Sequence, residues 1–86
     1  MYIVEFTRGS AKELKVIDSK VAAKIMQKIK ILAINPTNKT LDIKKLKGLS
    51  SAYRLRIGDY RVIYEIENTK LVITIVKIGS RGNIYG

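Results

Sequence analysis

The stretch Tyr53–Ile66 most constrains the fold, because apolar and polar residues alternate on both sides of a single Gly-Asp pair. Strict alternation predicts strands with one buried face. A two-residue break that begins with glycine predicts a hairpin with a type II′ turn, in which Ile57 faces Tyr60 and Arg56 faces Arg61. The buried face would then hold Leu55, Ile57, Tyr60, Val62, Tyr64 and Ile66.

The opposite face of this hairpin would carry three arginines, Arg54, Arg56 and Arg61. Like charges directly opposite each other destabilise a sheet by roughly 0.2–1 kcal/mol. Glu65, two pair positions beyond Arg54, is the only acid expected near them on that face. Either the arginines keep an exposed face soluble, or they receive an anion, to which the planar and permanently charged guanidinium is well suited.

The length and composition indicate one folded domain spanning residues 1–86, with 47% apolar residues. The chain has no cysteine and no histidine, which excludes disulfides and thiolate chemistry and removes the commonest metal ligand and general base. We therefore expect neither a metal nor a cofactor. No apolar run is long enough to span a membrane, and the N-terminus resembles a strand more than a signal peptide, so a cytoplasmic protein is expected.

The charge is strongly unbalanced, with 17 Lys and Arg against 7 Asp and Glu and a net charge of +10. Such a domain attracts polyanions and holds nucleic acid in a salt-dependent way. Heat adaptation also enriches lysine, but it usually raises glutamate as well, and glutamate is scarce here. The charge balance therefore favours a nucleic-acid partner.

The N-terminal half predicts a strand and two helices. Residues 2–6 alternate as a strand, and Ser10 with Glu13 forms a capping-box pattern that would begin a short helix ending near Ile17. Asp18 or Ser19 would cap a longer helix over residues 21–34. The buried stripe of this helix would hold Val21, Ala22, Ile25, Ile29, Leu32 and Ala33.

Residues 42–49 form a short basic segment that contains Lys44, Lys45 and Lys47. It is either a solvated surface turn or a positive rim that contacts phosphates. A further strand is expected over residues 71–78, with Leu71, Ile73 and Ile75 on the core face.

Two C-terminal residues could join the arginines of the hairpin. If Ile66 pairs with Leu71, Arg61 lies beside Val76, and Arg81 emerges at the same end of the sheet as Arg56 and Arg61. Tyr85 could converge on the same patch. The order strand, helix, helix and strand meander predicts an α+β domain, in which an antiparallel meander of three to four strands packs on the helices.

The segments 45–49, 53–66 and 76–81, with the closing Ile84-Tyr85, resemble the RelE/ParE superfamily of toxin–antitoxin toxins, most closely its RelE branch. The match covers nearly the whole chain. It implies a RelE-like microbial RNase fold and a toxin that cleaves mRNA in the ribosomal A site, in contact with 16S and 23S rRNA. It also implies a cognate RelB-like antitoxin, held in a toxin–antitoxin heterotetramer.

The resemblance further implies a metal-independent endoribonuclease in which the 2′-OH attacks the neighbouring phosphodiester. Arg61 and Arg81 would stabilise the phosphate, Arg56 would assist the leaving 5′-oxygen or bind the same phosphate, and Tyr85 would stack on a base or orient the 2′-OH. The resemblance also makes Arg54 a candidate RNA-binding residue. The basic segment itself adds Lys44, Lys45 and Lys47 to the candidate RNA-binding set.

The chain departs from the family pattern in two respects. Arg54 and Arg56 stand where the best-studied members have lysines, and Ser80 stands where many relatives have histidine. Because arginine does not deprotonate usefully, these residues do not identify a general base. Two other classes stay open, a ParE-like toxin that inhibits DNA gyrase and a basic RNA-binding module without catalysis.

Overall fold

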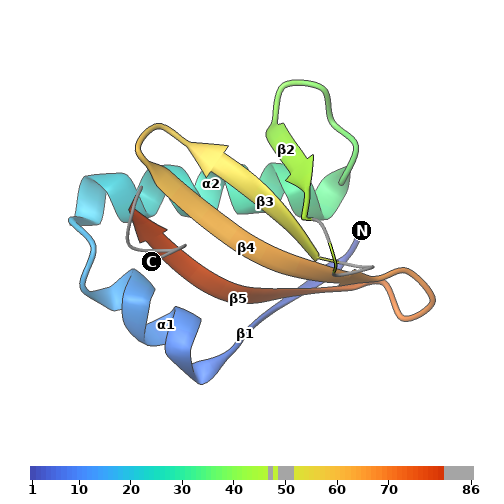
Figure 1. Ribbon diagram of the computed structural model, residues 1–86, viewed down its shortest axis with the longest axis horizontal. Helices are drawn as coiled ribbons and strands as arrows, with labels where there is room; N and C mark the ends of the chain where they lie inside the picture. Colours follow the sequence, from blue (N-terminus) through green and yellow to red (C-terminus); the bar gives the residue numbers. More distant parts are fainter. Residues whose placement is uncertain (47, 49–51, 81–86) are drawn as a thin grey trace.

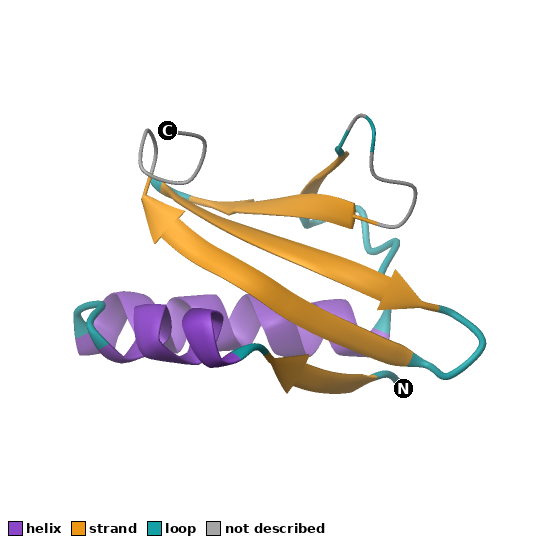
Figure 2. Ribbon diagram, turned by 60° about the horizontal axis from the view of Figure 1, so that its bottom comes forward, coloured by secondary structure: helices purple, strands orange, loops and turns teal. Residues whose placement is uncertain are grey.

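The computed structural model describes residues 1–46, 48 and 52–80. In chain order the elements are β1 (Ile3–Phe6), α1 (Arg8–Lys15), α2 (Ser19–Ile34), β2 (Asp42–Lys45), β3 (Ala52–Ile57), β4 (Tyr60–Glu67) and β5 (Val72–Ser80). Among these residues the strands form one sheet in the order β1-β5-β4-β3-β2, parallel between β1 and β5 and antiparallel elsewhere (Figure 1). The helices lie on one side of the curved sheet (Figure 2). The predicted α+β fold, in which an antiparallel meander of three to four strands packs on two helices, is confirmed, and the observed meander runs from β2 to β5.

The β3–β4 hairpin has the predicted register, with Ile57 opposite Tyr60 and Arg56 opposite Arg61. Gly58 adopts a φ of +59°, and Leu71 is the one described non-glycine residue with a positive φ, so Asp59 has a negative φ. These signs are those of a type II′ turn. The core combines the α2 stripe with the apolar sheet face, and its fully buried members include Ile25, Ile29, Leu32, Leu55, Val62, Tyr64, Ile73 and Ile75.

The predicted register of β5 is wrong. Ile66 pairs with Ile73 and Arg61 pairs with Gly79, whereas Leu71 lies in the preceding turn with a φ of +55° and is 47% exposed. The pairing also shifts by one residue between Ile63 and Tyr64, which leaves Val76 as an extra residue on β5. This bulge reverses the alternation of the strand, so that Ile78 enters the core together with Ile73 and Ile75.

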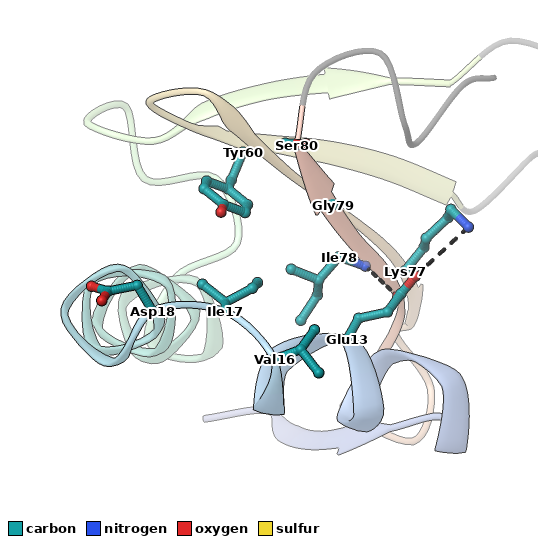
Figure 3. A pocket seen from close by; sticks show the side chains of 9 residues that line it. All are labelled: Glu13, Val16, Ile17, Asp18, Tyr60, Lys77, Ile78, Gly79 and Ser80. Carbon is teal, nitrogen blue, oxygen red and sulfur yellow. Dashed lines mark hydrogen bonds and ion pairs between the residues drawn. The ribbon is translucent and has the colours of Figure 1, made fainter.

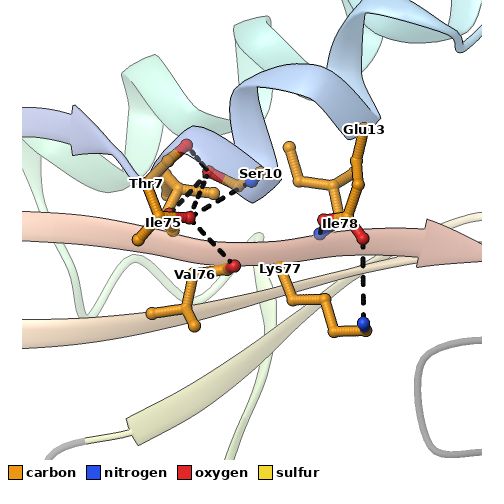
Figure 4. Close-up of polar contacts among 7 residues, drawn as sticks. All are labelled: Thr7, Ser10, Glu13, Ile75, Val76, Lys77 and Ile78. Atoms are coloured by element: carbon orange, nitrogen blue, oxygen red, sulfur yellow. Dashed lines mark hydrogen bonds and ion pairs between the residues drawn. The ribbon is translucent and has the colours of Figure 1, made fainter.

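The capping-box prediction for α1 is also wrong, because Thr7 is the N-cap and its hydroxyl accepts a hydrogen bond from the Ser10 amide. Ser10 is buried, and its Oγ donates to the Ile75 carbonyl oxygen at 2.7 Å. Glu13 Oε1 accepts from the Ile78 amide at 2.8 Å (Figure 4). Since β1 pairs with β5 only as far as Ile75, side chains of α1 satisfy backbone groups of β5 from Ile75 onwards.

Helix α2 is capped by Asp18, one of the two predicted residues, because Asp18 Oδ2 accepts a hydrogen bond from the Lys20 amide at 3.1 Å.

Neither helix in the described part of the chain has the length and apolar character that a membrane span requires.

Candidate functional site

Two arginines converge at the turn end of the β3–β4 hairpin, where Arg56 and Arg61 are direct cross-strand partners. Arg56 Nε and Arg61 Nη1 each donate to the Gly58 carbonyl oxygen at 3.4 Å, and Arg61 Nη1 also donates to the Tyr60 carbonyl oxygen at 3.3 Å. Bonds of this length are weak. The two guanidinium groups are therefore held near one point by the strands more than by strong polar contacts.

The electrostatic surroundings of this arginine pair are unusual. Arg61 is only 7% exposed, and the ion pairs among the described residues are Arg54–Asp42 and Lys77–Glu13. Neither Arg56 nor Arg61 thus has a carboxylate partner in the described part of the chain. A buried cation without a counter-charge is costly, so an anion that bridged the two groups would relieve this cost.

Arg54 differs from the other two arginines because its Nη2 lies 3.2 Å from Asp42 Oδ1. Asp42 reaches this face because residues 42–45 form β2, which pairs with β3 and places Asp42 opposite Arg56. The expectation that Glu65 is the only acid near the arginines is therefore wrong. Arg54 Nε is buried and has no hydrogen-bond partner among the described residues.

The lysines of the basic segment divide between the two faces of the sheet. Lys44 pairs with Arg54 and shares the outer face with the arginines, whereas Lys45 pairs with Tyr53 on the opposite face. Both are exposed. Lys47, Arg81 and Tyr85 lie outside the described residues.

A pocket of about 310 Å³ lies between the joint of the helices and the ends of β4 and β5 (Figure 3). Tyr60 and Ile78 line it, and so do Glu13 and Asp18. Both acids already have structural roles, Glu13 with Lys77 and the Ile78 amide and Asp18 as the cap of α2. In the described ranges, no cluster of three or more acidic, histidine or cysteine residues could hold a metal ion.

Among the described residues, one titratable group, the hydroxyl of Tyr64 in the core, has a clearly shifted pKa. Burial, with a smaller contribution from Tyr53, raises the pKa of the Tyr64 hydroxyl. The two rings are stacked with centroids 5.6 Å apart, and the Tyr64 hydroxyl has no hydrogen-bond partner within the described structure. These features indicate a packing role for Tyr64.

Sequence comparisons match the chain to a family of toxins. A family model described as the ParE toxin of the type II toxin–antitoxin system parDE matches residues 4–85. The chain is 37% identical over 83 residues to "Putative toxin RelE1" of Methanocaldococcus jannaschii, which covers 95% of this chain and 92% of that protein. It is 26% identical over 82 residues to "mRNA interferase toxin RelE" of Escherichia coli K12, with coverages of 93% and 83%.

Solved structures of similar chains have the same fold. The RelE–RelB complex of Pyrococcus horikoshii OT3 contains a chain that matches with a TM-score of 0.82 and 32% identity, over 95% of this chain and 97% of that one. The isolated Escherichia coli RelE toxin matches with a TM-score of 0.81 and 22% identity, over 99% and 92% of the two chains.

Proposed function

Because this chain belongs to the ParE toxin family of type II toxin–antitoxin systems, we propose that it is a RelE-like mRNA interferase that cuts messenger RNA on the ribosome. Relatives named mRNA interferase RelE support this activity. The single structural observation that carries the proposal is the pair Arg56 and Arg61, which donate to one carbonyl oxygen and have no carboxylate partner among the described residues.

The proposed reaction is transfer of the phosphoryl group within the RNA strand. The 2′-oxygen attacks the adjacent phosphorus, the bond to the 5′-oxygen breaks, and the products are a 2′,3′-cyclic phosphate and a 5′-hydroxyl. Negative charge grows on the phosphoryl oxygens in the transition state. Guanidinium groups already positioned there stabilise this charge without reorganisation, and each such donor contributes about 2.7–4 kcal/mol in comparable sites.

Each arginine has a distinct proposed role in this reaction. Arg61 is buried and makes long hydrogen bonds to two carbonyl oxygens. It would exchange these for hydrogen bonds to the phosphoryl oxygens. Arg56, which is exposed, binds the same phosphate or assists the leaving 5′-oxygen. Arg81 directly follows Ser80, the strand partner of Tyr60, and is proposed to complete the set, while Tyr85 is proposed to stack on a base or orient the 2′-OH.

Proton transfer falls to groups outside this arginine set, because arginine stays protonated in proteins. Alignment of the 2′-oxygen by the ribosome would supply part of the rate enhancement, since orientation alone contributes about 7–11 kcal/mol in well-aligned reactions. Arg54 and Lys44, together with Lys45 and Lys47, are proposed to contact RNA phosphates around the reacting one.

A RelB-like antitoxin is the proposed protein partner. Several similar structures are RelE–RelB complexes, and this chain carries a net charge of +10 that an acidic partner would offset. We propose that the antitoxin covers the arginine face and that the two proteins form a heterotetramer.

Primer extension on mRNA in programmed ribosomes tests this function. Wild-type protein should produce a truncated cDNA at the A-site codon, and Arg61→Ala and Arg81→Ala should abolish it, whereas the control Lys12→Ala on α1 should not. Intact mRNA after treatment with the wild-type protein would refute the nuclease proposal. The description of the matching family as ParE toxins makes inhibition of DNA gyrase the second candidate, which a parallel supercoiling assay would detect.

A further inference from the structure

A groove of about 640 Å³ separates residues 21–28 of α2 from the β3–β4 turn. The turn side contributes Arg56, Ile57, Gly58, Asp59 and Tyr60, and the helix side contributes Val21, Lys24, Gln27 and Lys28. The sequence pattern places Lys24 and Lys28 on the solvent side of α2, and only the tertiary structure sets them across from the turn. The groove is thus a concave surface built from two distant segments.

The lining of the groove is predominantly cationic. Lys24, Lys28 and Arg56 face a single carboxylate, Asp59. Helix α2 contains no acidic residue over its whole length, so its lysines lack the intrahelical partners that exposed lysines commonly have. Lys20, Lys24 and Lys28 instead follow one another at i, i+4 spacing, which costs roughly 0.2–0.5 kcal/mol for each like-charged pair. In the described part of the chain, no ion pair involves Lys24 or Lys28.

The groove is continuous with the arginine pair. Arg56 lines the groove, and its Nε donates to the same Gly58 oxygen that Arg61 contacts. A strand whose phosphate lay between Arg56 and Arg61 would therefore have a positively charged path past the turn. Lys24 and Lys28 are one helical turn apart, about 6 Å along the helix axis, so they can reach successive positions along such a strand.

We propose that this groove binds the sugar–phosphate backbone of single-stranded RNA next to the reacting phosphate, with Lys24 and Lys28 contacting phosphates. The inference rests on the proposed function for the identity of the strand. Long, flexible lysines that act as point charges suit backbone contacts independent of base sequence. Asp59 repels the backbone from the turn and directs it towards α2, while Val21 and Ile57 offer apolar contact to the riboses.

Binding of an uncleavable 2′-O-methyl RNA oligonucleotide tests the inference by fluorescence anisotropy. The double variant Lys24→Ala/Lys28→Ala is compared with Lys12→Ala/Lys15→Ala, which removes two exposed lysines from α1 and so matches it in net charge. Loss of two phosphate contacts should make the negative slope of log association constant against log salt concentration less steep by about 1.4. Between about 50 and 200 mM salt it should also weaken binding roughly tenfold or more. The control pair should keep the wild-type slope.

Equal losses in the two double variants would overturn the inference, because the lysines would then act only through the general field of the protein. It would also be overturned if the groove variant bound RNA normally but lost affinity for poly-glutamate, which would assign the groove to an acidic protein segment. Lys24→Gln/Lys28→Gln, with longer side chains, repeats the test if the alanine variant folds poorly. Primer extension on ribosomes reports separately on the proposed function, so wild-type protein that binds RNA through the groove but cuts no mRNA would refute the nuclease alone.

Discussion

Replacing Arg61 by methionine should separate what the fold requires from what the proposed site requires. Methionine keeps a long, unbranched side chain at this position of β4 and removes the charge. Arg56 Nε and Arg61 Nη1 each lie 3.4 Å from the Gly58 oxygen, so the two nitrogens are at most about 6.8 Å apart. At that separation two unit charges repel each other by about 0.6 kcal/mol in water and by about 2.4 kcal/mol at an effective dielectric constant of 20.

The hydrogen bonds that Arg61→Met removes are weak by comparison. Both bonds donated by Arg61 are 3.3 Å or longer, and the Gly58 oxygen still accepts from Arg56. We therefore expect the free energy of unfolding to rise, by up to about 2 kcal/mol at low ionic strength, and the gain to shrink as salt screens the repulsion. Cleavage of ribosome-bound mRNA should nevertheless fall by about 10²–10³-fold, the usual effect of losing one transition-state donor.

Urea unfolding followed by circular dichroism, at low and high salt, measures the effect of Arg61→Met on the free energy of unfolding. A higher midpoint with an unchanged slope would indicate a real change in stability. Arg54→Met is the matched control, because Arg54 is paired with Asp42 and its loss should lower stability or leave it unchanged. The reasoning is refuted if Arg61→Met is the less stable of the two variants, or if it still cleaves mRNA at the wild-type rate.

Three further substitutions test the fold around the site. Tyr64→Phe should raise the free energy of unfolding by about 1 kcal/mol, because it removes a buried hydroxyl that lacks a partner among the described residues. Burial raises the pKa of Tyr64 in the folded state, so above about pH 10 only the unfolded state releases the proton. Wild-type stability should then fall by up to about 1.4 kcal/mol per pH unit more steeply than that of Tyr64→Phe in alkaline urea titrations; parallel curves would contradict this account. Glu13→Ala should cost about 1–3 kcal/mol, because it leaves the Ile78 amide unpaired, whereas Glu13→Gln can still accept that bond and should cost less than about 1 kcal/mol; equal thermal shifts would argue against the tether. Gly58→Ala should cost about 1 kcal/mol by chemical denaturation, because Gly58 has a φ of +59°, and an unchanged midpoint would argue against the II′ turn.

Local patterns in the sequence determined the hairpin, the long helix and most of the core. A two-residue loop joins β3 to β4, so the loop itself sets the register, and alternation then assigns every side chain to a face. The cross-strand pairing of Arg56 with Arg61 follows from this register, and the structure confirms this pairing. The stripe on α2 was equally readable, because it depends only on helical periodicity.

The tertiary structure alone decided which distant segments meet. Asp42 bonds to Arg54 because β2 pairs with β3, yet a four-residue polar segment carries no signal that names its partner strand. The S-x-x-E pattern of Ser10 and Glu13 reads the same whether it caps α1 or, as here, binds the backbone of β5. The bulge at Val76, which turns Ile78 into the core, likewise depends on how β5 pairs with β4.

The candidate site likewise has one part that the sequence predicts and another that only the folded chain determines. Its central arginine pair follows from residues close in sequence, whereas the pairing of Arg54 with Asp42 and the groove beside Arg56 depend on the packed chain. The roles of Lys47, Arg81 and Tyr85 stay predictions. A strand or helix records its own period in its sequence, but a contact between segments far apart depends on the shape and the unpaired backbone groups of both, and these exist only once the chain has folded.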